Sequence, residues 1–200
     1  PDDNGNGTGG EPPAMPTADS TGLTIETAAA NTTTDSTDTT DNTSTSAKAL
    51  KAGNEVNISG GEFKIDSADD SVHSNGNIVI TGGNISVASG DDGMHANGNL
   101  TISDGTVDIT KSYEGIEGSI VTIDGGTISV VASDDGINCA GGSDTGSTDR
   151  MGADQFSSQD GVELNINGGT ITIDAEGDGL DSNGNFTMAG GTVYVCGPTN

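Results

Sequence analysis

A block of about 22 residues recurs along the chain and constrains its fold more than any other feature. The clearest copy covers residues 78–99 and reads IVITGGNISVASGDDGMHANGN. Related blocks cover residues 56–77, 100–119, 121–142 and 164–185, and a shorter one begins at residue 186. A fixed period of this length is typical of solenoids, in which each repeat forms one coil of a stack.

Apolar residues occupy five positions of the block, and polar residues alternate with them, as in I-x-I and I-x-V. Alternation over three or four residues is typical of short strands with one buried face. Gly-Gly or Asp-Gly separates the first two strands, and an Asn-Gly-type turn closes the block. The five apolar columns are Val56, Ile78, Leu100, Val121, Leu164 and Phe186; Ile58, Ile80, Ile102, Ile123, Ile166 and Met188; Phe63, Ile85, Val107, Ile128, Ile171 and Val193; Ile65, Val87, Ile109, Val130, Ile173 and Val195; and Val72, Met94, Ile116, Ile137 and Leu180.

Three short strands and three turns in one block describe a coil of a parallel β-helix, an all-β fold. Its coils would stack about 4.8 Å apart, the spacing of hydrogen-bonded strands. A coil cannot bury its apolar side alone, so its stability comes from its neighbours. A β-sandwich of the same strands is the alternative, and the in-register columns argue against it.

The repeat predicts two regions. Residues 1–46 are a low-complexity segment rich in Thr, Asp and Gly, which either leads into the solenoid or packs on it, with residues 22–26 as a possible edge strand. Residues 47–200 form the β-helix, in which Leu50 joins the Val72 column and residues 143–161 are an inserted loop. We expect the chain to be a processed piece of a longer protein in which further coils follow.

Composition excludes some classes of function. The formal net charge is -26, with five Lys and Arg residues, so nucleic acid is not expected as a partner because binding it requires basic contacts to phosphates. No apolar run approaches the length of a membrane span. Cys139 and Cys196 fall in different columns of non-adjacent coils, so we expect unpaired, partly buried thiols rather than a disulfide.

In the loop before the third strand, the second of two aligned positions is acidic in all five coils, and the first is also acidic in three of them. Carboxylates stacked about 5 Å apart repel by roughly 3 kcal/mol at an effective dielectric constant near 20, which suggests that a cation lies between the coils. Many flexible oxygen ligands favour Ca²⁺. The expected ligands are Asp69, Asp70, Asp91, Asp92, Glu114, Asp134, Asp135 and Asp178, with Glu117 and Asp181 as further candidates.

Two other interpretations of this loop remain open. Asp-Gly also suits a tight turn, in which case the charges would be solvated. His73 and His95, three residues after the second acidic position, could instead indicate zinc, but we expect them to be polar surface or hydrogen-bonding residues.

The blocks DDGMHANGN, KSYEGIEGS, SDDGINCAGG and GDGLDSNGN, with the closing VYVCGPTN, resemble a bacterial family of β-helix carbohydrate-binding domains. The family is similar in fold to pectate lyases, and the resemblance covers about residues 47–200. It implies a right-handed single-stranded parallel β-helix, calcium bound by the acidic loops, and a place outside the cell or on the bacterial surface. It also implies recognition of plant cell-wall polysaccharide, acidic pectin-type chains (polygalacturonate) included, with cellulose as a further candidate.

Three functions follow as hypotheses. The first is calcium-dependent, non-catalytic polysaccharide binding, for which Tyr113, Lys111 and Arg150 are the candidate substrate contacts. The second is a polyuronate lyase acting by β-elimination, which needs a cation and a base, and for which Lys111 is the candidate. The third is a structural or adhesive solenoid that calcium only makes rigid.

Overall fold

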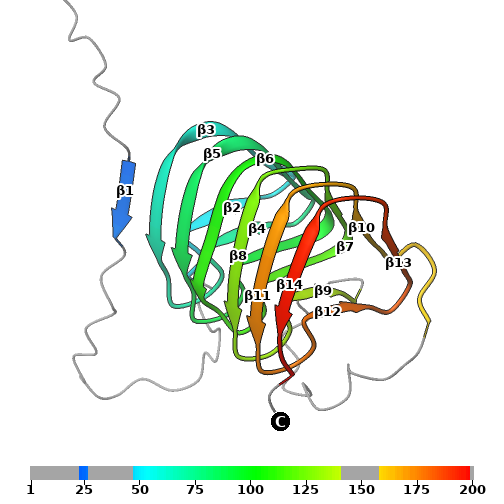
Figure 1. Cartoon of the computed structure of the whole chain (residues 1–200). Helices are drawn as coiled ribbons and strands as arrows, with labels where there is room; N and C mark the ends of the chain where they lie inside the picture. The colour runs from blue at the N-terminus through cyan, green and yellow to red at the C-terminus, as the bar shows by residue number, and fades with distance from the viewer. Residues whose placement is uncertain (1–22, 27–46, 141–157, 199–200) are drawn as a thin grey trace, which may run out of the picture.

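The computed structural model describes residues 23–26, 47–140 and 158–198 (Figure 1). Every regular element in these ranges is a β-strand. No helix in these ranges has the length and apolar character that crossing a membrane requires. The strands are β1 (Leu23–Glu26), β2 (Leu50–Ala52), β3 (Glu55–Asp66), β4 (Val72–Ser74), β5 (Asn77–Ala88), β6 (Met94–Lys111), β7 (Ile116–Ile123), β8 (Thr127–Ala132), β9 (Ile137–Cys139), β10 (Glu163–Ile166), β11 (Thr170–Ala175), β12 (Leu180–Ser182), β13 (Asn185–Met188) and β14 (Thr192–Cys196).

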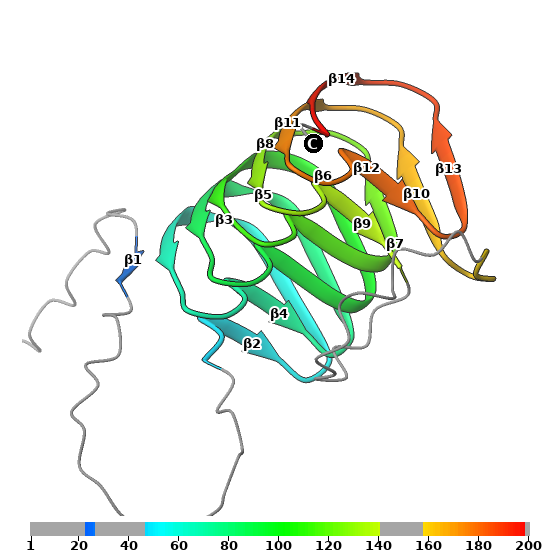
Figure 2. The same ribbon diagram turned by 90° about the horizontal axis from the view of Figure 1, so that it is seen from below.

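The strands wind into a parallel β-solenoid of about six turns with coils of about 22 residues, as the repeat predicted. All strand pairings are parallel, and each joins a strand to its counterpart in the next coil. The coils therefore stack side by side from β2 and β3 to β13 and β14 (Figures 1 and 2). The short strands β2, β4, β9 and β12 lie on the side that carries the third strand of each coil. This stacking excludes the β-sandwich.

The predicted apolar columns form the core. Ile80 pairs in register with Ile102, which pairs with Ile123, and all three side chains are fully buried. Leu50 pairs with Val72, which confirms that the repeat extends back to β2. Burying one such aliphatic side chain contributes roughly 1.5–3 kcal/mol, so the columns are the main source of stability.

The last coil departs from the expected burial. Phe186, Met188 and Val195 belong to buried columns in the sequence, but they are 52%, 48% and 44% exposed. They are exposed because each side chain packs against a coil on one side only, and no described coil covers the other. Cys196 in the same coil is exposed as well, while Cys139 is buried, and both are unpaired.

Glycine shapes the coils at two repeated positions. The turn between the first two strands has a positive φ in each coil, for example 105° at Gly83 and 101° at Gly105, a conformation that favours glycine. In the acidic loop the constraint is space instead. A Cβ atom on Gly115 would lie 2.3 Å from both the Gly136 carbonyl oxygen and the Val130 side chain. Glycine there allows the acidic loops to stack closely.

The N-terminal segment contributes one described element. Strand β1 pairs in parallel with β3, Leu23 opposite Phe63, which confirms the edge strand that the sequence suggested. The rest of residues 1–46, most of the predicted inserted loop, and the candidate contact Arg150 lie outside the described residues.

Candidate functional site

The acidic loops stack along one flank of the solenoid and form two parallel rows of side chains. Backbone bonds hold the stack, since the Tyr113 N–H donates to the Asp91 carbonyl at 2.7 Å and the Asp134 N–H donates to the Tyr113 carbonyl at 3.0 Å. The outer row consists of Asp69, Asp91, Tyr113 and Asp134, which are half-buried. The inner row consists of Asp70, Asp92, Glu114, Asp135 and Asp178.

Burial distinguishes the inner row from a set of solvated turns. Asp70 is fully buried and Asp92 is 7% exposed. Their carboxylates accept hydrogen bonds from the backbone of the next coil, because the Asp92 N–H donates to Asp70 Oδ1 and the Glu114 N–H donates to Asp92 Oδ1, both at 3.3 Å. The Asp178 N–H donates to Asp135 Oδ1 at 2.7 Å in the same way. The interpretation of the acidic positions as solvated turn residues is therefore wrong for Asp70 and Asp92.

A lysine closes the inner row at its N-terminal end. Lys48 precedes Asp70 by 22 residues, so it occupies the coil position that carboxylates occupy in every later coil. Its ammonium group donates to Asp70 Oδ2 and lies 3.2 Å from Asp69 Oδ1. Burial alone would raise the pKa of Asp70, but hydrogen bonds from His73 and Lys48 lower that pKa to about 2. Sequence reasoning missed this lysine, although its spacing from Asp70 was a usable signal.

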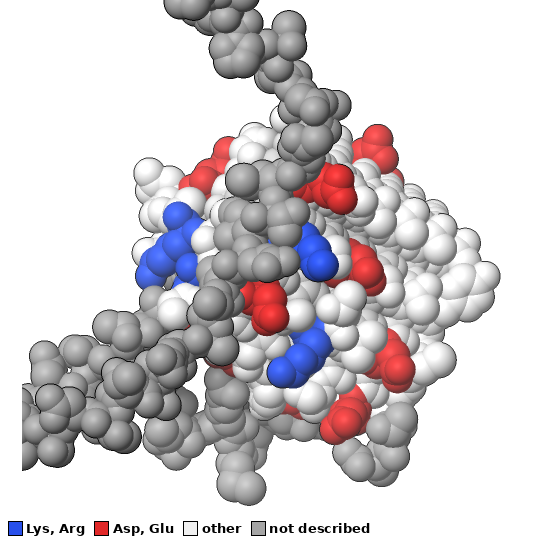
Figure 3. Space-filling model, turned by 90° about the vertical axis from the view of Figure 1, so that its left-hand side faces the viewer, with Lys and Arg blue, Asp and Glu red and all other residues white. Residues whose placement is uncertain are grey.

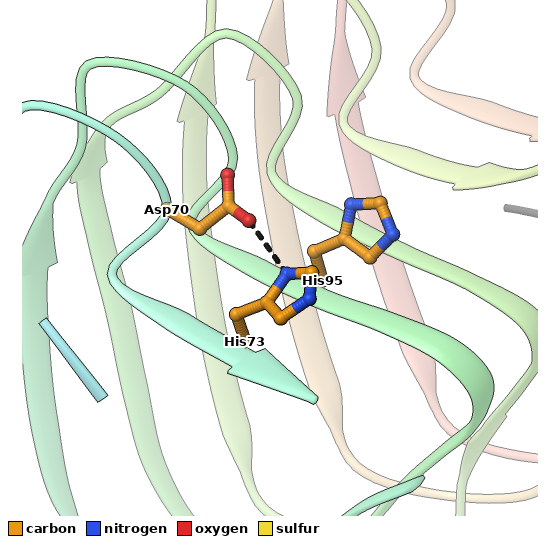
Figure 4. Close-up of side chains that lie close together, drawn as sticks. All are labelled: Asp70, His73 and His95. Carbon is orange, nitrogen blue, oxygen red and sulfur yellow. Dashed lines mark hydrogen bonds and ion pairs between the residues drawn. The ribbon is translucent and has the colours of Figure 1, made fainter. Parts of the chain in front are cut away.

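The two histidines are buried inside the loop. The expectation that they are polar surface residues is therefore wrong. His73 and His95 are 3% and 2% exposed, and the centroids of their rings are 5.0 Å apart (Figure 4). His73 Nδ1 lies 2.8 Å from Asp70 Oδ2, so the expected hydrogen-bonding role is confirmed. Strand pairing of β4 with β6 brings these histidines together, because it places His73 opposite His95.

Positive charge is concentrated at one end of the stack. Lys48, Lys51 and Lys64 belong to the first coils, and after Lys111 the sequence contains one further basic residue, Arg150. Figure 3 looks onto the end that carries β3 and shows lysine side chains interspersed with acidic ones. The acidic positions of later coils continue without lysines at equivalent positions.

The later carboxylates show the effect of this imbalance. Burial, followed by repulsion from Glu117 and Asp92, raises the pKa of Glu114 to about 9. Burial and the neighbouring carboxylates also raise the pKa of Asp135 to about 6. A bound cation would offset this repulsion, so the inner row has the electrostatic character of a cation site.

One place in the rows fits calcium. Ligand oxygens of Asp69, Asp70 and Asp91 lie within 4.8 Å of one another, an all-oxygen set in which two residues are half-buried. The Lys48 ammonium group contacts two of these carboxylates and would compete with an ion there. Farther along, Asp134 Oδ1 and Asp135 Oδ1 converge on the space beside Gly177. A Cβ atom there would lie 2.7 Å and 2.6 Å from them. Glycine at this position therefore lets the backbone pass close to these two carboxylates, and Asp178 follows directly.

The other predicted ligands are placed differently. Glu117 is turned inward to His95, with Oε2 2.7 Å from Nδ1. Asp181 is half-buried on β12 opposite Asn138, one row away from Asp178. Of the candidate sugar contacts, Tyr113 stands in the outer row between Asp91 and Asp134, and Lys111 is exposed at the end of β6.

These features define a class of protein, a parallel β-solenoid with a stacked acidic flank. Residues 14–93 and 94–198 each match a family described as carbohydrate-binding domain-containing protein, and the chain belongs to that family. The two matched segments meet between Gly93 and Met94, inside the stack. Comparisons with curated proteins and with solved structures give no match.

Proposed function

We propose that the chain binds carboxylated plant cell-wall polysaccharide, of the polygalacturonate type, through calcium ions held by the outer row, and that it does so outside the cell or on a bacterial surface. Family membership supports binding to carbohydrate. The observation that carries the rest is the outer row itself, which presents the half-buried carboxylates of Asp69 and Asp91 in two successive coils and that of Asp134 two coils farther along.

Half-exposed ligands suit a bridging role. Calcium takes six to eight oxygen ligands, and Asp69, Asp70 and Asp91 supply only part of that number. The remaining positions face solvent, where water or a sugar carboxylate can complete the coordination. A linear polyuronate repeats its carboxylates, so it could engage calcium at more than one coil. The combined affinity would then exceed that of a single site.

The charge of -26 does not argue against an acidic ligand, because bound calcium inverts the local field. Tyr113 interrupts the row with an aromatic ring, the type of group that stacks on the apolar face of a sugar. Stacking is a minor contribution in a chain with 2% aromatic residues. The proposal therefore assigns most of the affinity to calcium.

Retention on immobilised polygalacturonate, with calcium or with chelator, tests the proposal. The wild-type chain should be retained with calcium and released by chelator. The double variant Asp69→Asn/Asp91→Asn should lose retention. The matched control Asp108→Asn/Asp174→Asn, on strands β6 and β11 away from the loop, removes the same charge and should be retained. Equal retention of both double variants, or retention that survives chelator, would show that the outer row is not the binding site. Immobilised cellulose, run in parallel, decides whether a neutral glucan is also bound.

A further inference from the structure

A second kind of ligand set lies behind the outer row. Strand pairing aligns His73, His95, Glu117 and Asn138 in successive coils. The side chains are enclosed, since Glu117 is 14% exposed and His95 only 2%. A polysaccharide cannot reach this column, so its chemistry is separate from sugar binding.

Two carboxylates converge on one nitrogen of this column. Asp92 Oδ2 lies 3.1 Å and Glu117 Oε2 lies 2.7 Å from His95 Nδ1. One ring nitrogen carries at most one hydrogen, so the two oxygens compete for it. Ligands around a tetrahedral zinc ion stand about 3.4 Å apart, as follows from bonds of about 2.1 Å. To accept an ion, Asp92 Oδ2 and Glu117 Oε2 thus need to move away from the nitrogen by about 0.3 Å and about 0.7 Å.

The preceding coil provides an internal comparison. His73 Nδ1 faces the single carboxylate of Asp70, and Lys48 neutralises that carboxylate. One coil later no lysine takes the equivalent place, because Asp70 itself precedes Asp92 in the inner row. Asp92 is buried, and the acidic residues Asp70 and Glu117 lie in the coils on either side of it. The later group therefore lacks the lysine that the earlier one has.

The other nitrogen of His95 gives an independent indication. His95 Nε2 is buried and has no hydrogen-bond partner, and neither has the buried Oδ1 of Asn97. In the preceding coil the equivalent atoms, His73 Nε2 and Asn75 Oδ1, are bonded at 3.0 Å. A metal on His95 Nδ1 would fix the ring hydrogen on Nε2, and Asn97 Oδ1 stands two residues on as its acceptor. Metal-binding histidines usually donate their second N–H to such an oxygen.

We propose that Asp92, His95 and Glu117 form a buried site for one divalent transition-metal ion of the zinc class. A nitrogen ligand with two carboxylates in an enclosed space suits zinc, whereas calcium prefers six to eight oxygens. The ion would join the loop before Met94 to strand β7 in the next coil and so tie two coils together. It is a structural ion, distinct from the calcium of the outer row.

The two histidines are the only ones in the chain, so NMR of the ring nitrogens follows each separately. Calcium-saturated protein is titrated with Zn²⁺. We expect one equivalent to bind, with the His95 ring becoming metal-bound at Nδ1 and protonated at Nε2, while the His73 ring keeps its resonances. Zinc that changes neither ring, or the His73 ring alone, would overturn the assignment. This measurement needs no variant, so it remains decisive if substitutions impair folding.

Matched variants then locate the ion. His95→Gln should weaken Zn²⁺ binding at least about 100-fold, whereas His73→Gln, one coil earlier in the same column, should change it less than about threefold. Equal losses in both would place the ion between the two rings and overturn the site. Calcium binding should survive His95→Gln, so this test can fail while the proposed calcium function holds. With Co²⁺ as the probe, a thiolate charge-transfer band would place the metal at a cysteine and likewise contradict the proposal.

Discussion

The Lys48 ammonium group bonds to the Asp70 carboxylate from the coil before it, at the position where every later coil carries an acidic residue. The Lys48 side chain thus supplies a positive charge at the start of the inner row. The side chains of both residues are almost fully enclosed, at 5% and 0% exposure. This pair shows that a positively charged partner stabilises a buried, stacked carboxylate. The later coils have no such lysine, so a cation for them would have to come from solution.

Replacing Lys48 by Met should destabilise the calcium-free protein by about 2–3 kcal/mol, because a buried carboxylate loses a charged partner. The loss is limited because His73 still contacts Asp70. Urea denaturation in chelator measures it. The control Lys51→Met, on the exposed neighbour in β2, should change the free energy of unfolding by less than about 0.5 kcal/mol. Adding calcium should raise the free energy of unfolding more in the Lys48 variant than in wild type, since the ammonium group no longer competes with calcium for the carboxylates. An equal gain in both proteins would contradict a calcium site at Asp69, Asp70 and Asp91.

Gly115→Ala should cost several kcal/mol, because its Cβ would overlap the carbonyl of Gly136 in the next coil. Backbone atoms of a stacked coil cannot move aside as the end of a side chain can. Gly60→Ala is the matched control, since nothing lies within 4 Å of its Cβ position. Thermal unfolding followed by circular dichroism compares the two. A Gly115→Ala protein that melts with wild type would show that the loops do not need this close approach.

The sequence was sufficient to predict the coil, the five columns and the stacked loops, because each depends on a pattern that repeats in phase. Ile80, Ile102 and Ile123 could be aligned without coordinates. Features that break the pattern were harder to foresee. Lys48 lies in a half-repeat before the first clear block, so its place in the acidic row was not recognised. The burial of His95 depends on Glu117 bending inward from the next coil, and a one-coil alignment cannot show that. Met188 is exposed although its column is buried, because burial here depends on having a neighbour on each side.

Stability of the chelated protein should fall as pH rises from 5 to 8.5. The pKa of Glu114 is raised to about 9 in the folded state, so between its ordinary value and 9 the folded state binds more protons than the unfolded one. The free energy of unfolding then decreases with pH. Asp92, with a pKa raised to about 7 by burial, acts in the same direction up to about pH 7. His95, with a pKa raised to about 11 by its two carboxylate partners although burial opposes the shift, acts in the same direction above pH 6.5. The depressed pKa of Asp70 matters only below this range.

Melting temperatures in chelator at pH 5, 7 and 8.5 measure this dependence, with an expected fall on the order of 5 °C. Glu114→Gln should flatten the curve and melt higher than wild type at pH 8.5. Glu176→Gln, on an exposed side chain of the same flank, should leave the slope unchanged. A melting temperature that rises between pH 5 and 8.5 would mean that the buried carboxylates are already neutralised by other groups.

The last prediction concerns cleavage. Elimination from a uronate requires a base beside the carbon that loses its proton, in reach of the calcium that binds the sugar carboxylate. Lys111 is exposed at the end of β6 and lies in the same coil as Tyr113 and Glu114, so it is the described residue best placed to act as that base. Lys111 is exposed, and it is the one lysine or arginine between Lys64 and Arg150 in the sequence, so no second basic group accompanies it in its coil. We therefore expect the chain to bind polygalacturonate in excess calcium without forming the unsaturated product. Absorbance of that product, followed alongside retention on the polymer, decides the matter. Sustained product formation that disappears in Lys111→Ala, but not in Lys64→Ala, would establish a lyase and replace the binding-only function.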